Sequence, residues 1–126
     1  MIVPYGKIDT NVWAAESGGT WAVAGGTGHY RAVVYKRCTP EHCYDTLFIE
    51  WIAVTSGDTK LVTSKQVVEV GDLTVVSKTV FVLSGAGTRL EVANEMVSGD
   101  ERWTRCFQLG SPGKYVVSEG RCKKAG

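Results

Sequence analysis

The sequence predicts an all-β fold, a single antiparallel meander of about eight or nine strands that form a sandwich or a flattened barrel. The β-branched residues Val, Thr and Ile number 34, whereas Leu, Ala and Met number 17. Branched side chains suit the pleated, half-buried surface of a strand. Glycine-rich turn signals separate the apolar runs at intervals of roughly ten to fifteen residues, and no run has the apolar period of a helix.

A single domain is expected over residues 1–126. Hydrophobic residues make up 44% of the chain and charged residues 21%, a composition that predicts a folded core rather than disorder. The formal net charge is only +1. Because attraction to nucleic acid or to an anionic membrane needs an excess of positive charge, neither is expected as a partner. The longest apolar stretch, residues 47–54, is too short for membrane insertion.

The first third of the chain predicts three strands. They cover residues 8–15, 20–25 and 29–38, and the pairs Gly18-Gly19 and Gly25-Gly26 are the expected turns between them. The connections are short here and in the rest of the chain. Short connections favour antiparallel pairing, because parallel strands need long crossovers.

The next strand, 44–55, is expected at the centre of a sheet. Leu47 and Ile49 would lie on one face and Phe48 on the other, so that both faces carry apolar side chains and both are covered. Glu50 interrupts this run. It is either an outward-facing carboxylate or a buried one with a partner, and we expect the outward orientation.

The remaining strands show one clear alternation. In strand 88–97, Leu90 and Val92 would face the core, whereas Arg89 and Glu91 would face solvent, so this sheet is expected to be wet on one side. The other strands in this part of the chain are predicted over residues 59–70, 73–84, 101–109 and 114–122.

Four cysteines are present, and none has the C-x-x-C spacing of a metal site or a redox centre. Four cysteines allow three pairings, and in only one of these does each bridge close a short local loop. That pairing joins Cys38 to Cys43 across the neck of a hairpin and Cys106 to Cys122 across a second hairpin, which turns at residues 111–113. Four reduced cysteines are the alternative.

Disulfides persist in oxidising compartments, so this pairing predicts a periplasmic or secreted protein. The first residues lack the basic segment and the long apolar stretch of a signal peptide. The chain is therefore expected to be a mature form with an added Met1, or else a cytoplasmic protein with reduced cysteines.

The sequence contains no catalytic, cofactor or metal motif. His29 and His42 lack the spacing of metal ligands, and no nucleophile elbow of the G-x-S-x-G type occurs. The glycine-rich segment 25–28 is not followed by the Lys-Ser/Thr of a phosphate-binding loop. We therefore expect a non-enzymatic protein without a cofactor or a metal.

The most unusual local sequence joins two strong strands through small residues. It consists of Ser84, Gly85, Ala86, Gly87, Thr88 and Arg89. Small residues let a loop backbone approach another surface closely, and the guanidinium of Arg89 offers donors to carboxylates. This segment is the candidate loop for binding a protein partner, and an ordinary hairpin with a glycine bulge is the alternative.

Three segments resemble the periplasmic inhibitors of invertebrate-type lysozyme, which are small exported β-sandwich proteins. Residues 18–23 (Gly-Gly-Thr-Trp-Ala-Val) precede residues 28–35 (Gly-His-Tyr-Arg-Ala-Val-Val-Tyr), and the loop 84–89 follows later, in the order that the family shows. The resemblance covers roughly residues 13–105 and implies that the loop enters the lysozyme cleft, where Ser84 would bind a catalytic carboxylate. Arg89 stands where the family has a tyrosine, and an arginine suits a cleft with two carboxylates.

The resulting hypothesis is an exported binding protein that inhibits a lysozyme or another cell-wall hydrolase through a protruding loop. One alternative is a lipocalin-like carrier of a small molecule, suggested by the number of strands and by Trp21 in a Gly-x-Trp context. Another is an accessory or immunity-type protein with an unknown partner.

Overall fold

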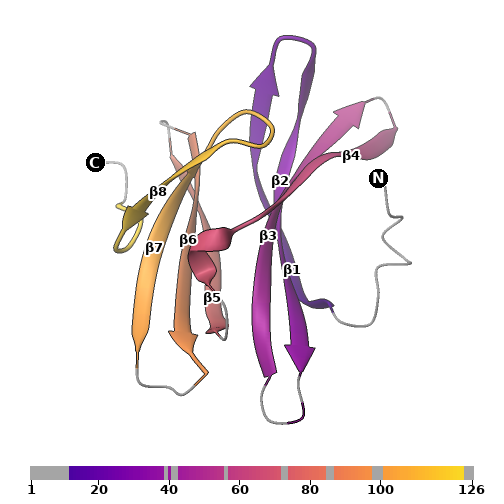
Figure 1. The fold of residues 1–126 in the computed structure, drawn as a ribbon. Helices are drawn as coiled ribbons and strands as arrows, with labels where there is room; N and C mark the ends of the chain where they lie inside the picture. The colour runs from indigo at the N-terminus through magenta and orange to yellow at the C-terminus, as the bar shows by residue number, and fades with distance from the viewer. Residues whose placement is uncertain are drawn as a thin grey trace.

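A computed structural model describes residues 12–38, 40, 43–55, 57–71, 74–84, 87–97 and 101–123. In these residues, eight antiparallel strands form two four-stranded meander sheets, which pack face to face as a sandwich (Figure 1). The first sheet contains β1 (Val12–Val23), β2 (Gly26–Cys38), β3 (Cys43–Thr55) and β4 (Asp58–Gln66). The second contains β5 (Thr74–Ser84), β6 (Gly87–Met96), β7 (Arg102–Leu109) and β8 (Tyr115–Glu119).

The all-β prediction is confirmed, and of the two expected forms the sandwich is the one observed. Among the described residues each sheet pairs its strands only in chain order, so the sheets do not close into a barrel. The space between them is filled by side chains from both sheets, and the most deeply buried, at 0 to 1% exposure, are Leu47, Ile49, Trp51, Val67, Leu90, Val92 and Phe107. The lipocalin-like barrel is therefore not formed.

The expected turn at Gly18-Gly19 is wrong. Within the described residues, the strands predicted over 8–15 and 20–25 belong to one strand, β1, which has a shift in its pairing register between Gly18 and Thr20. Gly19 has a φ of 65°, and a Cβ on either glycine would overlap the side chains of Phe81 or Thr88 in the second sheet. The two glycines thus form a bulge that lets the sheets approach each other, rather than a chain reversal.

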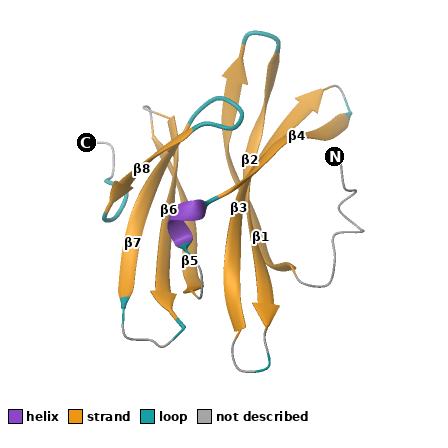
Figure 2. Ribbon diagram, in the orientation of Figure 1, coloured by secondary structure: helices purple, strands orange, loops and turns teal. Residues whose placement is uncertain are grey.

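The strand predicted over 59–70 is too long at its end. Pairing stops at Gln66, and Val68–Val70 form a short 3-10 helix (Figure 2). Figure 2 shows this helix where the chain passes from the first sheet to the second. Valine favours strands, but the burial of Val67 and Val70 in the core bends the segment inward, so tertiary packing overrides local preference.

The outward orientation expected for Glu50 is observed, but its carboxylate is buried and paired, as the alternative had it. Glu50 does lie on the outer face of β3, but it is only 3% exposed, and it pairs with Arg31, its cross-strand neighbour on β2. Val33 and Ile52 on the same outer face are also buried, at 0% and 5% exposure. Phe48, which the sequence analysis placed on this face, is only half-buried, so the outer face is buried over part of the strand, and a carboxylate buried there requires a partner.

The strand predicted over 88–97 places Leu90 and Val92 in the core as expected. The expectation that Glu91 faces solvent is wrong, because Glu91 is only 4% exposed. The chain after β8 covers it, and the backbone N–H of Cys122 donates to its carboxylate over 2.9 Å.

Candidate functional site

Both predicted disulfides are present. Cys38 and Cys43 are directly opposite each other at the end of the β2–β3 pair, with 4.0 Å between their Cα atoms. Cys106 on β7 is joined to Cys122, which follows β8, with a Cα separation of 4.9 Å. Two disulfides hint at an oxidising, extracytoplasmic environment.

The predicted binding loop lies at the connection between β5 and β6. Ser84 is the last residue of β5 and pairs in register with Gly87, the first residue of β6. Gly85 and Ala86, between them, lie outside the described residues. Figure 1 shows the start of β6 at the same end of the sandwich as the β1–β2 and β7–β8 connections.

The residues on the β6 side of this loop differ in exposure. Gly87 is exposed, Thr88 is 5% exposed, and Arg89 is half-buried. Thr88 packs against the backbone of Gly19 in the β1 bulge. Two of the three segments that carry the family resemblance, 18–23 and 84–89, therefore touch each other in the folded chain.

The C-terminal segment ties down the base of this hairpin. The Nη1 of Arg89 donates to the backbone carbonyl of Lys123 over 2.7 Å. The neighbouring residue, Cys122, is fixed by its disulfide to Cys106 and by the hydrogen bond from its N–H to Glu91. The first residues of β6, which follow the loop, are thus held by two hydrogen bonds to a C-terminal segment that a disulfide fixes to β7.

Glu91 is the charged centre of this anchor. Its Oε2 lies 3.1 Å from the Nζ of Lys78 and 3.5 Å from the Nε of Arg121. Burial alone would raise the pKa of Glu91, but the hydrogen bonds from Lys78 and Cys122, together with the charges of Arg121 and Lys78, hold that pKa below its usual value. The sequence indicated only a strand with alternating polarity at this position. The partners of Glu91 in residues 121–122 are distant in the sequence, so no local pattern indicates that Glu91 is buried.

The β7–β8 loop reaches across to the first sheet beside the predicted site. The carbonyl oxygen of Gly110 accepts hydrogen bonds from the hydroxyl of Tyr30 (2.9 Å) and the indole N–H of Trp51 (3.0 Å), and the Nζ of Lys65 donates to Gly113 O (3.0 Å). A pocket of about 400 Å³ lies under this loop. Its lining residues are Lys65, Gln108, Leu109, Gly110, Gly113, Lys114, Tyr115 and Val116.

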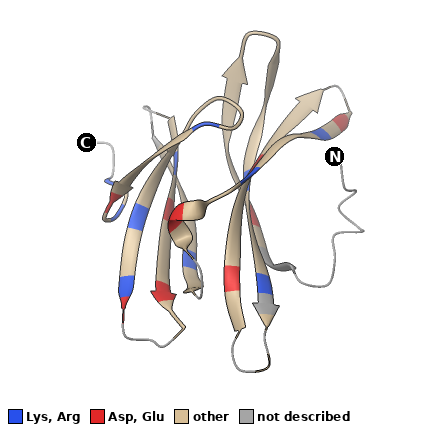
Figure 3. Cartoon of the chain, in the orientation of Figure 1, with Lys and Arg blue, Asp and Glu red and all other residues tan. Residues whose placement is uncertain are grey.

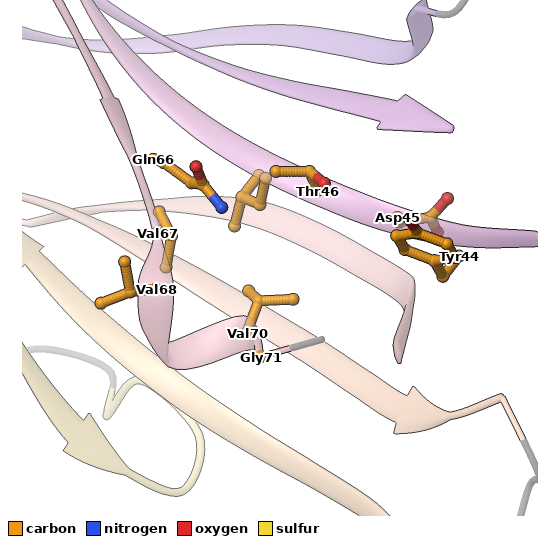
Figure 4. Close-up of a pocket in the computed structure, with 9 residues that line it drawn as sticks. Tyr44, Asp45, Thr46, Gln66, Val67, Val68, Val70 and Gly71 are labelled. Carbon is orange, nitrogen blue, oxygen red and sulfur yellow. The ribbon is translucent and has the colours of Figure 1, made fainter. Parts of the chain in front are cut away.

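A second pocket, of about 270 Å³, lies between the start of β3 and the segment that leads from β4 into the 3-10 helix (Figure 4). In Figure 4, Tyr44 and Asp45 lie on one side of it and Val67 and Val68 on the other. Its lining residues are Tyr44, Asp45, Thr46, Leu47, Gln66, Val67, Val68, Val70 and Gly71.

Charges of both signs are spread over both sheets (Figure 3). In the described part of the chain, no three histidine, cysteine or acidic side chains group as a metal site would require. Within the same residues, no helix has the length and apolar character needed to cross a membrane. His29 lies half-buried on β2, and His42 lies outside the described residues.

No known family model, curated protein or solved structure matches this chain.

Proposed function

We propose that this protein is an exported, non-enzymatic binding domain that inhibits a cell-wall hydrolase of the lysozyme type. The segment 84–89 enters the cleft of the hydrolase and blocks it. The family resemblance of residues 18–23, 28–35 and 84–89 suggests this function, and the sandwich fold and the two disulfides are compatible with it. Fold alone does not determine function, so the proposal depends on the loop.

The observation that carries the proposal is the anchoring of the loop at its base. Arg89 is bound to the carbonyl of Lys123, next to the Cys106–Cys122 disulfide, and Thr88 is packed on Gly19. A loop that is held before binding loses less conformational entropy when it enters a partner. A short inhibitory loop makes few contacts, so a small loss of conformational entropy on binding favours its affinity.

The surroundings of the loop also suit a protein cleft. Gly87 is exposed with a φ of 122°, and Leu83, just before the tip, is 65% exposed. Small residues at the tip let the backbone approach the cleft walls, and Leu83 offers an apolar contact at the entrance. Arg89 has a double role, since it holds the hairpin base through Lys123 and adds positive charge beside a cleft that contains carboxylates.

The test is inhibition of the lysis of bacterial cell walls by lysozymes of several classes, including the invertebrate type. We expect the wild-type protein to inhibit at least one class, and Ser84→Ala and Arg89→Ala to weaken that inhibition by about tenfold. Arg102→Ala is the matched control, because Arg102 is 78% exposed on β7 and belongs to a different ion pair, with Glu95. Absence of inhibition across all classes would remove the proposal.

A further inference from the structure

The pocket of about 400 Å³ under the β7–β8 loop lies between the outermost strands of the two sheets. Lys65 lines it from β4, the last strand of the first sheet, whereas Tyr115 and Val116 line it from β8, the last strand of the second. Sites for small organic ligands occupy roughly 300 to 1,000 Å³. The pocket is therefore large enough for a compact ligand.

The walls of this pocket include a fixed apolar surface. Leu109 is buried in the core, and the ring of Tyr115 packs edge-on against Phe107, with 5.4 Å between the ring centres. Val116 also lines the pocket and is 70% exposed. A ligand that covers these side chains removes apolar surface from water, which is favourable. The walls thus favour a ligand with an apolar body.

Two ammonium groups line the same pocket. The Nζ of Lys65 donates to the carbonyl oxygen of Gly113 over 3.0 Å and lies 5.0 Å from the centre of the Tyr115 ring. These contacts hold the Lys65 ammonium in place, and because an ammonium carries three N–H donors, donors remain for a ligand. Lys114 is exposed, and within the described ranges neither ammonium forms an ion pair.

The charge of the pocket is positive, because none of the described residues that line it is acidic. Glu69 contacts Tyr115 without lining the pocket, and its Oε1 accepts a hydrogen bond from the hydroxyl of Tyr115 over 2.7 Å. This carboxylate therefore lies at the hydroxyl end of the ring, whereas the Lys65 ammonium lies over the ring itself. Apolar walls with an uncompensated positive charge are complementary to an apolar anion.

We propose that this pocket binds a small organic monocarboxylate with a compact apolar body, such as an aromatic acid. The carboxylate accepts hydrogen bonds from the ammonium groups of Lys65 and Lys114, and the body packs on the apolar walls. A single negative charge suits the site, because apolar walls make it costly to remove a second charge from water. Since Gly113 already holds the Lys65 ammonium, binding orders few side chains.

The experiment is an NMR titration of the full chain with sodium 4-phenylbutyrate. The reporters are the backbone amides of Lys114 and Val116. Saturable shifts with a millimolar Kd are expected. Lys114→Gln should weaken binding by about threefold, which is the scale of one exposed ion pair, and Lys65→Gln together with Lys114→Gln by about tenfold. Lys114→Gln is the cleaner single variant, because Lys65 also holds Gly113.

Matched variants separate the pocket from general charge and surface effects. Lys60→Gln removes the same charge from β4, but Lys60 is exposed outside the pocket, so this variant should bind like the wild type. Val116→Ser should weaken binding, whereas Val68→Ser should not, because Val68 is equally exposed at 70% and does not line this pocket.

Comparison ligands test the two halves of the proposed ligand. Acetate, which lacks the apolar body, and 4-phenylbutan-1-ol, which lacks the charge, should each bind at least about tenfold more weakly than 4-phenylbutyrate. The absence of saturable shifts, equal affinity for the alcohol, or equal effects of Lys60→Gln and Lys114→Gln would overturn the proposal.

A peptide carboxylate is the competing occupant. Tighter binding of Nα-acetyl-Gly-Gly-Phe than of 4-phenylbutyrate would overturn the assignment to a small molecule, because it would assign the pocket to the C-terminus of a peptide. Weaker binding of the peptide supports the assignment. Neither result depends on whether the loop 84–89 inhibits a lysozyme.

Discussion

The indole N–H of Trp51 in the first sheet donates a 3.0 Å hydrogen bond to the carbonyl oxygen of Gly110, which follows the last residue of β7 in the second sheet. The hydroxyl of Tyr30 donates to the same oxygen. Trp51 is fully buried, so this polar contact crosses the core at the end of the sandwich where the β7–β8 loop lies. The bond aligns the two sheets at the end that also carries the predicted binding loop.

We expect Trp51→Phe to destabilise the fold by about 2 to 4 kcal/mol, because it removes buried volume and one of the two donors to Gly110. Urea unfolding followed by circular dichroism measures this loss. Trp103→Phe is the matched control, since Trp103 is half-buried and its indole N–H has no hydrogen-bond partner. An equal loss in the free energy of unfolding for Trp103→Phe and Trp51→Phe would show that the hydrogen bond between Trp51 and Gly110 does not contribute to stability.

Glu91 should make stability depend on pH. Its pKa is held below the ordinary value of 4.5 in the folded state. The unfolded chain therefore takes up a proton at a higher pH than the folded one, and the stability from Glu91 is present above about pH 4.5 and is lost as the pH falls through the folded pKa. We expect the free energy of unfolding of the wild type to fall over this range.

The comparison with Glu91→Gln isolates this effect. The variant should be less stable than the wild type near neutral pH, and the difference should shrink as the pH falls below about 4.5. Glu95→Gln serves as the control, because the partner of Glu95, Arg102, is 78% exposed and surface ion pairs contribute little. A difference between wild type and Glu91→Gln that stays constant with pH would contradict the prediction.

Local patterns in the sequence were sufficient for the fold class, most strand positions and the two disulfides. Glycine-rich turns and β-branched runs are short-range signals, and both cysteine pairs close local hairpins. Contacts between distant strands were not accessible in this way. Glu50 is paired with Arg31, which lies opposite it on the neighbouring strand. Glu91 is covered by the C-terminal segment, which returns to β6 and donates a hydrogen bond from Cys122. No sequence motif near either glutamate identifies its partner.

The candidate sites show the same division. The segment 84–89 stands out by its composition, whereas its anchor through Lys123 depends on the tertiary path of the chain. The pocket of about 270 Å³ combines residues 44–47 with residues 66–68, 70 and 71, and the hydrogen bond to the carboxylate of Asp45 comes from Val76 on the other sheet. No periodicity in the sequence indicates such a meeting of three segments.

Gly19→Ala should destabilise the fold more than Gly25→Ala. Both glycines have positive φ, 65° and 98°, so both variants carry a backbone cost of about 1 kcal/mol. A Cβ at Gly19 would also overlap the side chain of Thr88, whereas at Gly25 nothing lies within 4 Å. Thermal unfolding of the two variants measures the difference, and equal losses would show that the sheets do not need this close approach.

The two disulfides should differ in their effect on stability and on the loop. The Cys106–Cys122 bridge spans 16 residues and the Cys38–Cys43 bridge spans 5. Because a longer closed loop restricts the unfolded chain more, we expect Cys106→Ser with Cys122→Ser to cost about 3 kcal/mol and Cys38→Ser with Cys43→Ser about 2 kcal/mol. Denaturant unfolding of both double variants tests this order.

The functional consequence should be more unequal than the stability. Loss of the bridge at Cys122 releases the segment whose carbonyl, at Lys123, holds Arg89, whereas the bridge at Cys38 lies at the opposite end of β2 from the β1–β2 turn. At a temperature where both double variants remain folded, the Cys106–Cys122 variant should lose inhibition of cell-wall lysis and the Cys38–Cys43 variant should keep it. Equal inhibition by the two folded variants would contradict this prediction. It would show that the loop 84–89 is held in its inhibitory conformation without the Cys106–Cys122 bridge.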